Sequence, residues 1–347
     1  MFMKNFHLLL IFWVLLICSC AEKKQNNNHK LVGAYYFGAG YFTLVPDNIK
    51  RDISEMKKMG TDVICITATE GDITDNKSNI QFIIKTIHAN GMKVFIVPSN
   101  LAAITAGQPL EPSIFPYHHL NTWVINKDST KKIRRLSGAV CSFYYPEVKQ
   151  YFKDIVKQIM DTFKVDGIVW DEPKSTYWQD FSLLALENNK DGDFVKYMQD
   201  YAAFFSEINK YIKSINPNII IVQFDEACRN DTVVNESAKI KNIDYFGTDG
   251  CPYFTAESPY KGNRATKVLP VFGERYFKAA RNNNHKTFAL IENQYLTLEE
   301  VKSMEKNIDY ISSMDVDFLV YYYYGFYDGN SDYKMQVVNK IIEKFRK

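Results

Sequence analysis

The sequence predicts an α/β protein whose body is one closed barrel of eight parallel strands surrounded by helices. Short apolar runs alternate with segments of helical period. The runs are rich in Val and Ile, as expected for strands of a parallel sheet that is covered on both faces. Several neighbouring runs start about 30 residues apart, which is the length of one βα unit. We expect the eight strands at residues 31–37, 62–68, 93–99, 167–173, 218–226, 244–250, 286–294 and 316–324.

Helices are expected between the strands because apolar side chains recur there at spacings of three and four residues. The first helix should end at Gly60, since glycine is a common C-terminal stop. Thr297 and Glu300 form a capping box that begins the helix before the last strand. The final helix is expected from Tyr333 to Phe345. The clearest stripes are Ile49, Ile53, Met56 and Met59 after the first strand, and Val148, Phe152, Ile155, Ile159 and Phe163 before the fourth.

A doubly wound open sheet is the rival fold, and it should show a Gly-rich turn after its first strand. Here that strand leads into FGAGYF at residues 37–42, which lacks the third glycine of such a turn. Eight units favour closure into a single (β/α)8 TIM barrel. Two connections are long, at residues 100–145 and 174–217. Both begin at strand carboxyl ends, where such barrels build active sites, so we expect lids or binding loops after strands 3 and 4.

The N-terminus has the features of an export signal. Lys4 supplies a positive start, and residues 8–17 form an unbroken apolar run. That run is too short for a membrane span, which needs about 20 residues. The sequence ICSC at residues 17–20 resembles a bacterial lipobox. The resemblance implies a lipidated Cys20 and export to a bacterial membrane, at the outer membrane, the cell surface or the periplasmic face. An ordinary secretory signal is the alternative. The expected divisions are a lipoprotein signal peptide at 1–20, a polar tether at 21–30 and the barrel domain at 31–347.

Composition limits the range of partners. The formal net charge is +2, so we expect no nucleic-acid partner. Aromatic residues make up 15% of the chain, with 23 Tyr and 24 Phe. Most of these rings should fill the core, and the remainder could stack on a flat ligand. The sequence does not indicate an oligomeric state.

Four cysteines remain after the expected signal peptide, and none has metal-ligand spacing. A His-x-Glu-x-x-His pattern is also missing from the sequence. We therefore predict no catalytic metal and no cofactor. Cys228 and Cys251 each follow one of two strands that would be neighbours in a barrel. Export would allow them to form a disulfide, and the sequence leaves this open. The four cysteines are Cys65, Cys141, Cys228 and Cys251.

Carboxylates follow five of the eight predicted strands. In a closed barrel these positions meet at one mouth, and a carboxylate at the end of an apolar run is costly unless it is paired or has a function. We expect Asp72 and Asp225 to serve local structure by capping helices or binding loop N–H groups. The acids are Glu70, Asp72, Asp171, Glu172, Asp225, Glu226, Asp249 and Glu292.

The stretch CSFYYPEVKQYFKDIVKQIMDTFKVDGIVWDEPK at residues 141–174 resembles the fourth-strand region of (β/α)8 glycoside hydrolases. These enzymes cleave a glycosidic bond with two carboxyl groups. One protonates the leaving oxygen, and the other attacks the sugar or activates water. The triplet Asp-Glu-Pro at 171–173 matches the Asn-Glu-Pro of retaining members except in its first residue. The resemblance implies Glu172 as acid/base and Glu292 as nucleophile, acting on an extracytoplasmic glycan.

Other assignments remain open. In barrels that resemble α-galactosidases and amylases, the acid after Asp-Gly-Ile is the nucleophile. This would be Asp171, with Asp249 or Glu226 as the proton donor. The alternative function is a non-catalytic carbohydrate-binding lipoprotein on the same scaffold. A phosphate-using aldolase or isomerase is disfavoured, because no predicted strand ends in Lys and no Gly-rich phosphate loop follows the last two strands.

Further side chains near the strand ends are expected to contact sugar. Alternation sends about half of a strand's side chains outward against the helices. Trp170 and some of the four tyrosines at 321–324 can therefore pack outward instead. The cluster KKIRR at 131–135 is expected to be a solvated turn, with contact to an acidic glycan as the alternative. The predicted substrate contacts are Tyr35, Tyr36, Trp178, Glu226, Tyr253, Asn293 and Tyr323.

Overall fold

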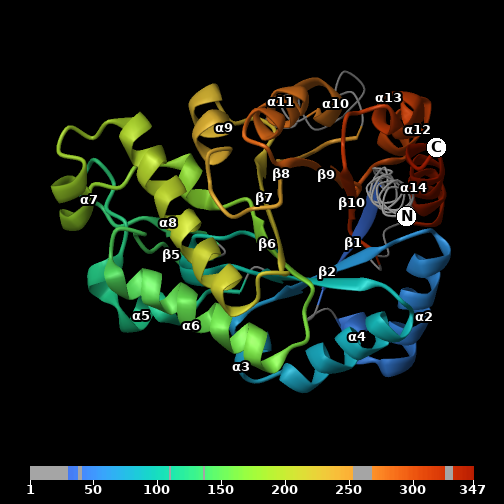
Figure 1. Cartoon of the computed structure of the whole chain (residues 1–347), viewed down its shortest axis with the longest axis horizontal. Helices are drawn as coiled ribbons and strands as arrows, with labels where there is room; N and C mark the ends of the chain where they lie inside the picture. The colour runs from blue at the N-terminus through green and yellow to red at the C-terminus, as the bar shows by residue number, and fades with distance from the viewer. Residues whose placement is uncertain (1–29, 38–40, 109–110, 136, 253–267, 325–330) are drawn as a thin grey trace, which may run out of the picture.

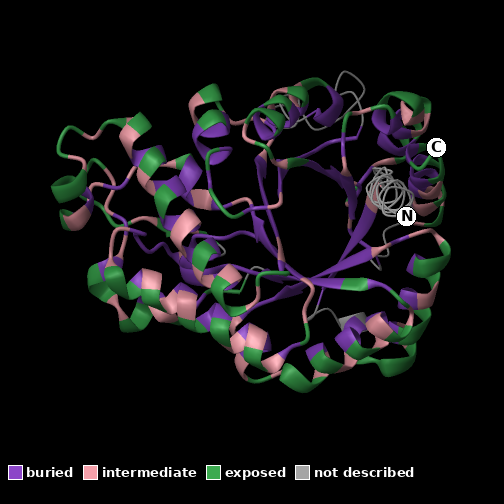
Figure 2. Cartoon of the chain, in the orientation of Figure 1, coloured by how far each residue is buried: buried purple, intermediate pink, exposed green. Residues whose placement is uncertain are grey.

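The computed structural model describes residues 30–37, 41–108, 111–135, 137–252, 268–324 and 331–347. In these residues eight parallel strands close into a barrel, in the order β1-β10-β9-β8-β7-β6-β3-β2, and helices surround it (Figure 1). The strands are buried, and the helices expose their outer surfaces (Figure 2). The predicted single (β/α)8 TIM barrel is therefore confirmed.

Each barrel strand lies within two residues of its predicted bounds at either end, because the apolar runs are uninterrupted. The predicted helical features are also present. Gly60 follows the first long helix with φ +88°, and Thr297 and Glu300 make the reciprocal hydrogen bonds of a capping box. The barrel strands are β1 (Leu31–Phe37), β2 (Val63–Ala68), β3 (Lys93–Pro98), β6 (Gly167–Asp171), β7 (Ile220–Glu226), β8 (Tyr245–Gly250), β9 (Lys286–Glu292) and β10 (Phe318–Tyr322).

The helices cover the outside of the barrel. Among the described residues, none of them is both long enough and apolar enough to cross a membrane. The α-helices are α2 (Pro46–Lys58), α3 (Glu70–Thr74), α4 (Lys77–Ala89), α5 (Phe115–His118), α6 (Pro146–Thr162), α7 (Leu183–Asn188), α8 (Phe194–Ile215), α9 (Asp231–Ser237), α10 (Leu269–Phe272), α11 (Glu274–Asn282), α12 (Leu298–Lys306), α13 (Ile308–Ser312) and α14 (Ser331–Phe345).

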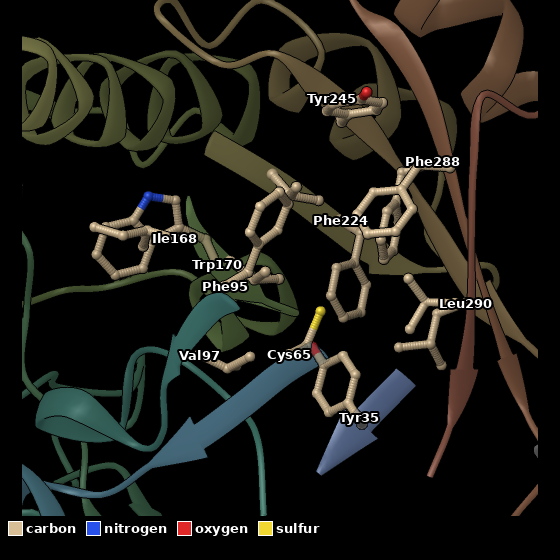
Figure 3. Packing of buried hydrophobic residues seen from close by; sticks show 14 of the residues in the cluster. Tyr35, Cys65, Phe95, Val97, Ile168, Trp170, Phe224, Tyr245, Phe288 and Leu290 are labelled. Carbon is tan, nitrogen blue, oxygen red and sulfur yellow. The ribbon is translucent and has the colours of Figure 1, made fainter. Parts of the chain in front are cut away.

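Aromatic rings from different strands fill the barrel interior (Figure 3). Phe318 of β10 contacts Phe95 of β3 and Phe288 of β9, with ring centroids 5.8 and 5.4 Å apart. Because β3 and β9 are not neighbours in the barrel, these rings meet across its interior. Gly167 makes room for them, since a Cβ there would lie 2.5 Å from the Phe95 ring. Phe224 stacks on Phe288 with centroids 5.1 Å apart and forms part of the cavity above.

The two long connections have more regular structure than expected. The segment after β3 contains short helices and a two-stranded hairpin, β4 (Ile133–Arg134) with β5 (Gly138–Ala139). The loop predicted at 174–217 is wrong in extent, because the 22-residue helix α8 occupies its second half. The irregular part of that connection includes the turn η4 (Lys174–Tyr177) and α7. The apolar stripe of α8 contains many aromatic residues, which the sequence analysis did not use.

Candidate active site

Five carboxylates from four strands line one cavity of about 290 Å³ at the carboxyl ends of the barrel strands. Asp171 ends β6, and Glu172 is the next residue. Glu226 ends β7, Asp249 lies on β8 and Glu292 ends β9. Parallel strands in register present their carboxyl ends on the same side, so acids far apart in the sequence meet here. The structure brings together all five acids that the sequence analysis proposed for the site, and their individual roles stay predictions.

Three of these acids lie very close together. Carboxylate oxygens of Glu172, Asp249 and Glu292 come within 4.8 Å of one another. Glu172 also has a positive φ of 33°, which is unusual for a residue other than glycine. Such strain often occurs at functional residues. The same three carboxylates are close enough to hold a divalent cation, so they are the candidate ligands if a metal does bind.

Basic side chains compensate part of this negative charge. Lys174 is partly buried in the site and donates to Glu172, and its ammonium lies 3.7 Å from Glu226 Oε1. Burial alone would lower the pKa of Lys174, but the carboxylates of Glu172 and Glu226 outweigh it and raise that pKa. Arg229 Nη2 donates to Glu226 Oε2 at 3.0 Å. Glu226 is therefore held by two cations, and Lys174 links it to Glu172.

Asp171 accepts a hydrogen bond of 2.9 Å from the Tyr35 hydroxyl. Burial raises the pKa of Asp171 to about 7, and the charge of Glu172 adds to the increase. Tyr35 was predicted to contact substrate, but it is fully buried and does not line the cavity. Its contact with Asp171 makes it a positioning residue beneath the site.

Alternation along the strands places two further predicted sugar contacts away from the cavity. Tyr36 points outward, because its hydroxyl donates to Asp52 Oδ2 of α2 at 3.0 Å. Tyr323 packs against Phe37, with ring centroids 4.1 Å apart, and lines a separate cavity next to α2 and α14. Tyr322, one residue earlier, lines the active-site cavity instead. The predicted contacts Tyr36 and Tyr323 therefore lie outside this cavity.

The remaining predicted contacts also lie away from the described cavity. Trp178 packs against Ala103, Val124 and Val140 in the segment after β3. Asn293 is fully buried and is not among the cavity-lining residues. Tyr253 lies outside the described residues. Of the predicted sugar contacts in the described residues, only Glu226 lines the cavity.

Cys228 and Cys251 do not form the disulfide that the sequence left open. Each thiol instead points toward a carboxylate. Cys228 Sγ lies 3.3 Å from Glu226 Oε2, and Cys251 Sγ lies 3.6 Å from Glu292 Oε2. Thiols are weak donors, so these contacts orient the carboxylates with little effect on their charge.

Sequence analysis missed several residues of the cavity. Lys174 has no distinguishing signal in the sequence, because it follows the strand end instead of forming it. Trp170, which could point either way, packs outward and donates to Asn209 of α8 at 2.8 Å. The other missed cavity residues lie mainly in loops, where no periodicity identifies them: Ala106, Gly107, Gln108, Arg134 and Gln294.

No protein-family model matches the chain, and no curated protein matches its sequence. Solved structures of glycoside hydrolases resemble its fold. A β-galactosidase from Halorubrum lacusprofundi superposes with a TM-score of 0.65 at 11% identity, covering 91% of this chain and 58% of that enzyme. A family 5 mannosidase from Rhizomucor miehei gives a TM-score of 0.59 at 12% identity, covering 91% and 93%. The β-amylase catalytic domain of Paenibacillus polymyxa gives 0.60 at 8% identity, covering 85% and 92%. At these identities the similarity defines the fold, a (β/α)8 barrel of the kind found in glycoside hydrolases.

Proposed function

We propose that this protein is a retaining glycoside hydrolase, with Glu172 as general acid/base and Glu292 as nucleophile. The observation that carries the proposal is the approach of these two carboxylates to within 4.8 Å at the mouth of the barrel. Retaining enzymes hold their two carboxyl groups about 5–5.5 Å apart, whereas inverting enzymes need about 6.5–9.5 Å to admit a water molecule. The short separation supports retention. The barrels of glycosidases with similar folds support the reaction class.

The residues suit a two-step reaction. The Glu292 carboxylate attacks the anomeric carbon while protonated Glu172 gives its proton to the leaving oxygen, so one C–O bond forms as another breaks. Ionised Glu172 then takes a proton from water, and the water oxygen displaces Glu292. Asp249 lies within reach of both groups, so we assign it to bind a hydroxyl of the reacting sugar.

The alternative pair has less support from the geometry. Asp171 would be its nucleophile, but burial raises the pKa of Asp171 to about 7. A carboxyl that is partly protonated at neutral pH is a weak nucleophile. Glu226 would be one of its proton donors, yet its two carboxylate oxygens already form ion pairs with Lys174 and Arg229.

One observation favours a second candidate, a non-catalytic carbohydrate-binding protein on the same barrel. Lys174 donates to Glu172, and this ion pair stabilises the ionised form of the residue that must carry a proton. In a hydrolase, substrate binding would have to loosen this pair. In a binding protein the pair would persist, and the acids would accept hydrogen bonds from sugar hydroxyls.

The test is a screen of the purified protein against a broad panel of oligosaccharides and polysaccharides, with sugar release as the readout. Glu172→Gln, Glu292→Gln and Asp249→Asn remove one charge each with almost no change in shape. We expect wild type to release sugar, and the two glutamine variants to lose at least about a hundredfold in rate. If Asp249→Asn abolishes activity while Glu292→Gln keeps most of it, the Asp171-led pair replaces ours. Binding without release by wild type would favour the second candidate.

We further propose that the chain is a lipoprotein that meets its glycan outside the cytoplasm. The support comes from the apolar run at residues 8–17 and the Cys-containing sequence after it, which lie outside the described residues. Labelled palmitate should be incorporated into the wild-type chain and into Cys18→Ala, but not into Cys20→Ala. Equal labelling of both variants, or no labelling of wild type, would contradict the anchor without affecting the hydrolase proposal.

A further inference from the structure

Arg134 differs from the rest of the basic segment at residues 131–135. Lys131, Ile133 and Arg135 are exposed, as a solvated turn would be, whereas Arg134 is partly buried and lines the active-site cavity. Its Nη1 donates to the carbonyl of Ala103 at 3.0 Å. This bond holds the guanidinium in a fixed orientation at the side of the cavity.

The charge of Arg134 is not paired within the described residues. Lys174 and Arg229, the other cations of the site, both form ion pairs with carboxylates. For Arg134 the described residues provide hydrogen bonds from Nη1 to the carbonyls of Ala103 and Thr105, and no ion pair. Burial lowers the pKa of Arg134, opposed by the more distant charges of Glu172 and Asp171. A guanidinium that loses water without gaining an anion is costly, and an anionic ligand would remove that cost.

The position of Arg134 also suits a sugar unit held across the cavity. Its carbonyl partner Ala103 lies in the segment that follows β3. In the closed barrel β3 and β9 are four strands apart in either direction, so they face each other across the barrel. Glu292 ends β9. A sugar whose anomeric carbon is near Glu292 can therefore direct a substituent toward Arg134 on the opposite wall.

We propose that Arg134 binds an anionic substituent of the substrate, so that the protein acts on an acidic glycan whose sugar carries a carboxylate or a sulfate ester. This inference rests on the proposed function, because it names the substrate class of the same site. Arginine suits either group, since its planar fork can donate two parallel hydrogen bonds to two oxygens of one anion.

The test compares the binding of free sugars that differ only at C6. The probes are galactose, galacturonate and galactose 6-sulfate, with the corresponding glucose and mannose series, measured by ligand-observed NMR on the purified protein. These sugars have no glycosidic bond, so hydrolysis does not enter the result. In at least one series we expect an anionic member to bind about tenfold more tightly than the neutral one. The uronate and sulfate probes show separately which anion is preferred.

Variants assign the preference to Arg134. Arg134→Gln should abolish it, and Arg134→Lys should keep part of it because the charge remains. Arg135→Gln is the matched control, since it removes the same charge from the adjacent exposed residue and should leave the preference unchanged. If Arg134→Gln does not fold, salt supplies the test on wild type, because added NaCl should weaken binding of the anionic sugar alone.

Two outcomes overturn the inference: equal binding of neutral and anionic sugars in every series, or a preference that survives Arg134→Gln. Release of sugar from neutral glycans together with equal binding would leave the proposed hydrolase standing and remove only the acidic substrate. A clear anionic preference in a protein that cleaves no glycan would support the anion-binding role of Arg134 and contradict the proposed hydrolase.

Discussion

The floor and the rim of the active-site cavity are built by different parts of the chain. The floor consists of Asp171, Glu226, Asp249 and Glu292, each on a barrel strand. The rim consists of the part of residues 99–145 that lines the cavity. The four acids of the floor are positioned by the parallel strands, because each strand places its last inward-facing residues at the same mouth of the barrel. The rim has no such repeating constraint.

The rim is held by hydrogen bonds between residues that are distant in sequence. Ala106 N donates to the Asp171 carbonyl at 2.8 Å, and Lys174 N donates to the Ile104 carbonyl at 2.6 Å. Ala102 and Ala103 adopt positive φ of 50° and 55°, so the chain turns sharply there. The comparison shows that the strands that stabilise the barrel also position the acids. The rim, in contrast, can change in sequence with little loss of fold stability.

Replacing Trp170 of the barrel wall and Trp178 outside the barrel should give the largest difference in stability. Trp170 is fully buried between β6 and the outer helices, where it contacts Phe152 and Phe205. Trp170→Ala should lower the free energy of unfolding by about 3–5 kcal/mol. Trp178 is only partly buried and packs against Ala103, Val124 and Val140 of the segment that carries the rim, so Trp178→Ala should lower this free energy by about 1 kcal/mol. Denaturant unfolding followed by circular dichroism measures both. Equal losses would mean that the rim is as integral to the fold as the barrel wall.

The pH dependence of the unfolding free energy should show how much stability is lost when a carboxyl buried in the barrel ionises. Burial raises the pKa of Asp225 to about 7, so the folded state binds this proton more tightly than the unfolded state does. Stability should therefore fall as pH rises from about 4 to about 7, and Asp225→Asn should remove the part of that fall that Asp225 causes. Asp171, whose pKa burial also raises to about 7, should keep its own part. At pH 8 the variant should exceed wild type by roughly 2–4 kcal/mol, and at pH 4 the two should be nearly equal.

Asp154→Asn is the control for this prediction, because it removes a carboxyl that is exposed on α6. Its effect on the unfolding free energy should be small at both pH values. If Asp225→Asn and Asp154→Asn respond to pH alike, Asp225 does not hold its proton in the folded state.

The sequence allowed the fold and the floor to be predicted for the same physical reason. Strands buried on both faces are apolar throughout, so their number and ends are evident, and acids that interrupt them mark the mouth. Because both faces of such a strand are apolar, the sequence does not indicate which side chains point into the barrel and which point toward the helices. Tyr322 and Tyr323 are chemically identical neighbours, yet one lines the active-site cavity and the other a separate cavity. In a strand with one solvated face, polarity would have distinguished them.

Residues of the rim could not be predicted because their positions depend on contacts far away in sequence. Arg134 reaches the cavity by donating to Ala103, 31 positions earlier. Nothing in the KKIRR segment distinguishes Arg134 from Arg135 until the hairpin that carries them is formed. Asp225 shows the same limit on a strand, since it was expected to cap a helix or bind a loop and is instead buried in the barrel wall.

Tyr35 and its neighbour Tyr36 allow the inward and outward faces of one strand to be compared. Tyr35 donates to Asp171 and Tyr36 donates to Asp52, so each phenylalanine variant loses one buried hydrogen bond to a carboxylate, and each should lose about 1–2 kcal/mol of stability. The Tyr35 bond favours ionised Asp171. In Tyr35→Phe the pKa of Asp171 should rise, and because Asp171 interacts with the charges of Glu172 and Glu292, the pH–rate profile should shift.

Tyr36→Phe should leave that profile unchanged, because Asp52 lies in the helix layer outside the barrel. The pH–rate profiles of both variants, measured on the glycan that wild type cleaves, separate a positioning role from a structural one. A shift of the same size in both variants would show that general loosening of β1, rather than the contact with Asp171, controls the profile.

Removal of divalent cations should have the smallest effect, which is no change in activity. Glu172, Asp249 and Glu292 are close enough to bind a cation, but Lys174 already donates to Glu172, and a divalent ion would have to compete with that ammonium. We therefore expect dialysis against EDTA to leave the rate of sugar release unchanged, and added Ca²⁺, Mg²⁺ or Mn²⁺ not to raise it. Loss of activity with EDTA that one of these ions restores would mean that the three carboxylates act as metal ligands, and that the site works by metal binding instead of by a paired acid and nucleophile.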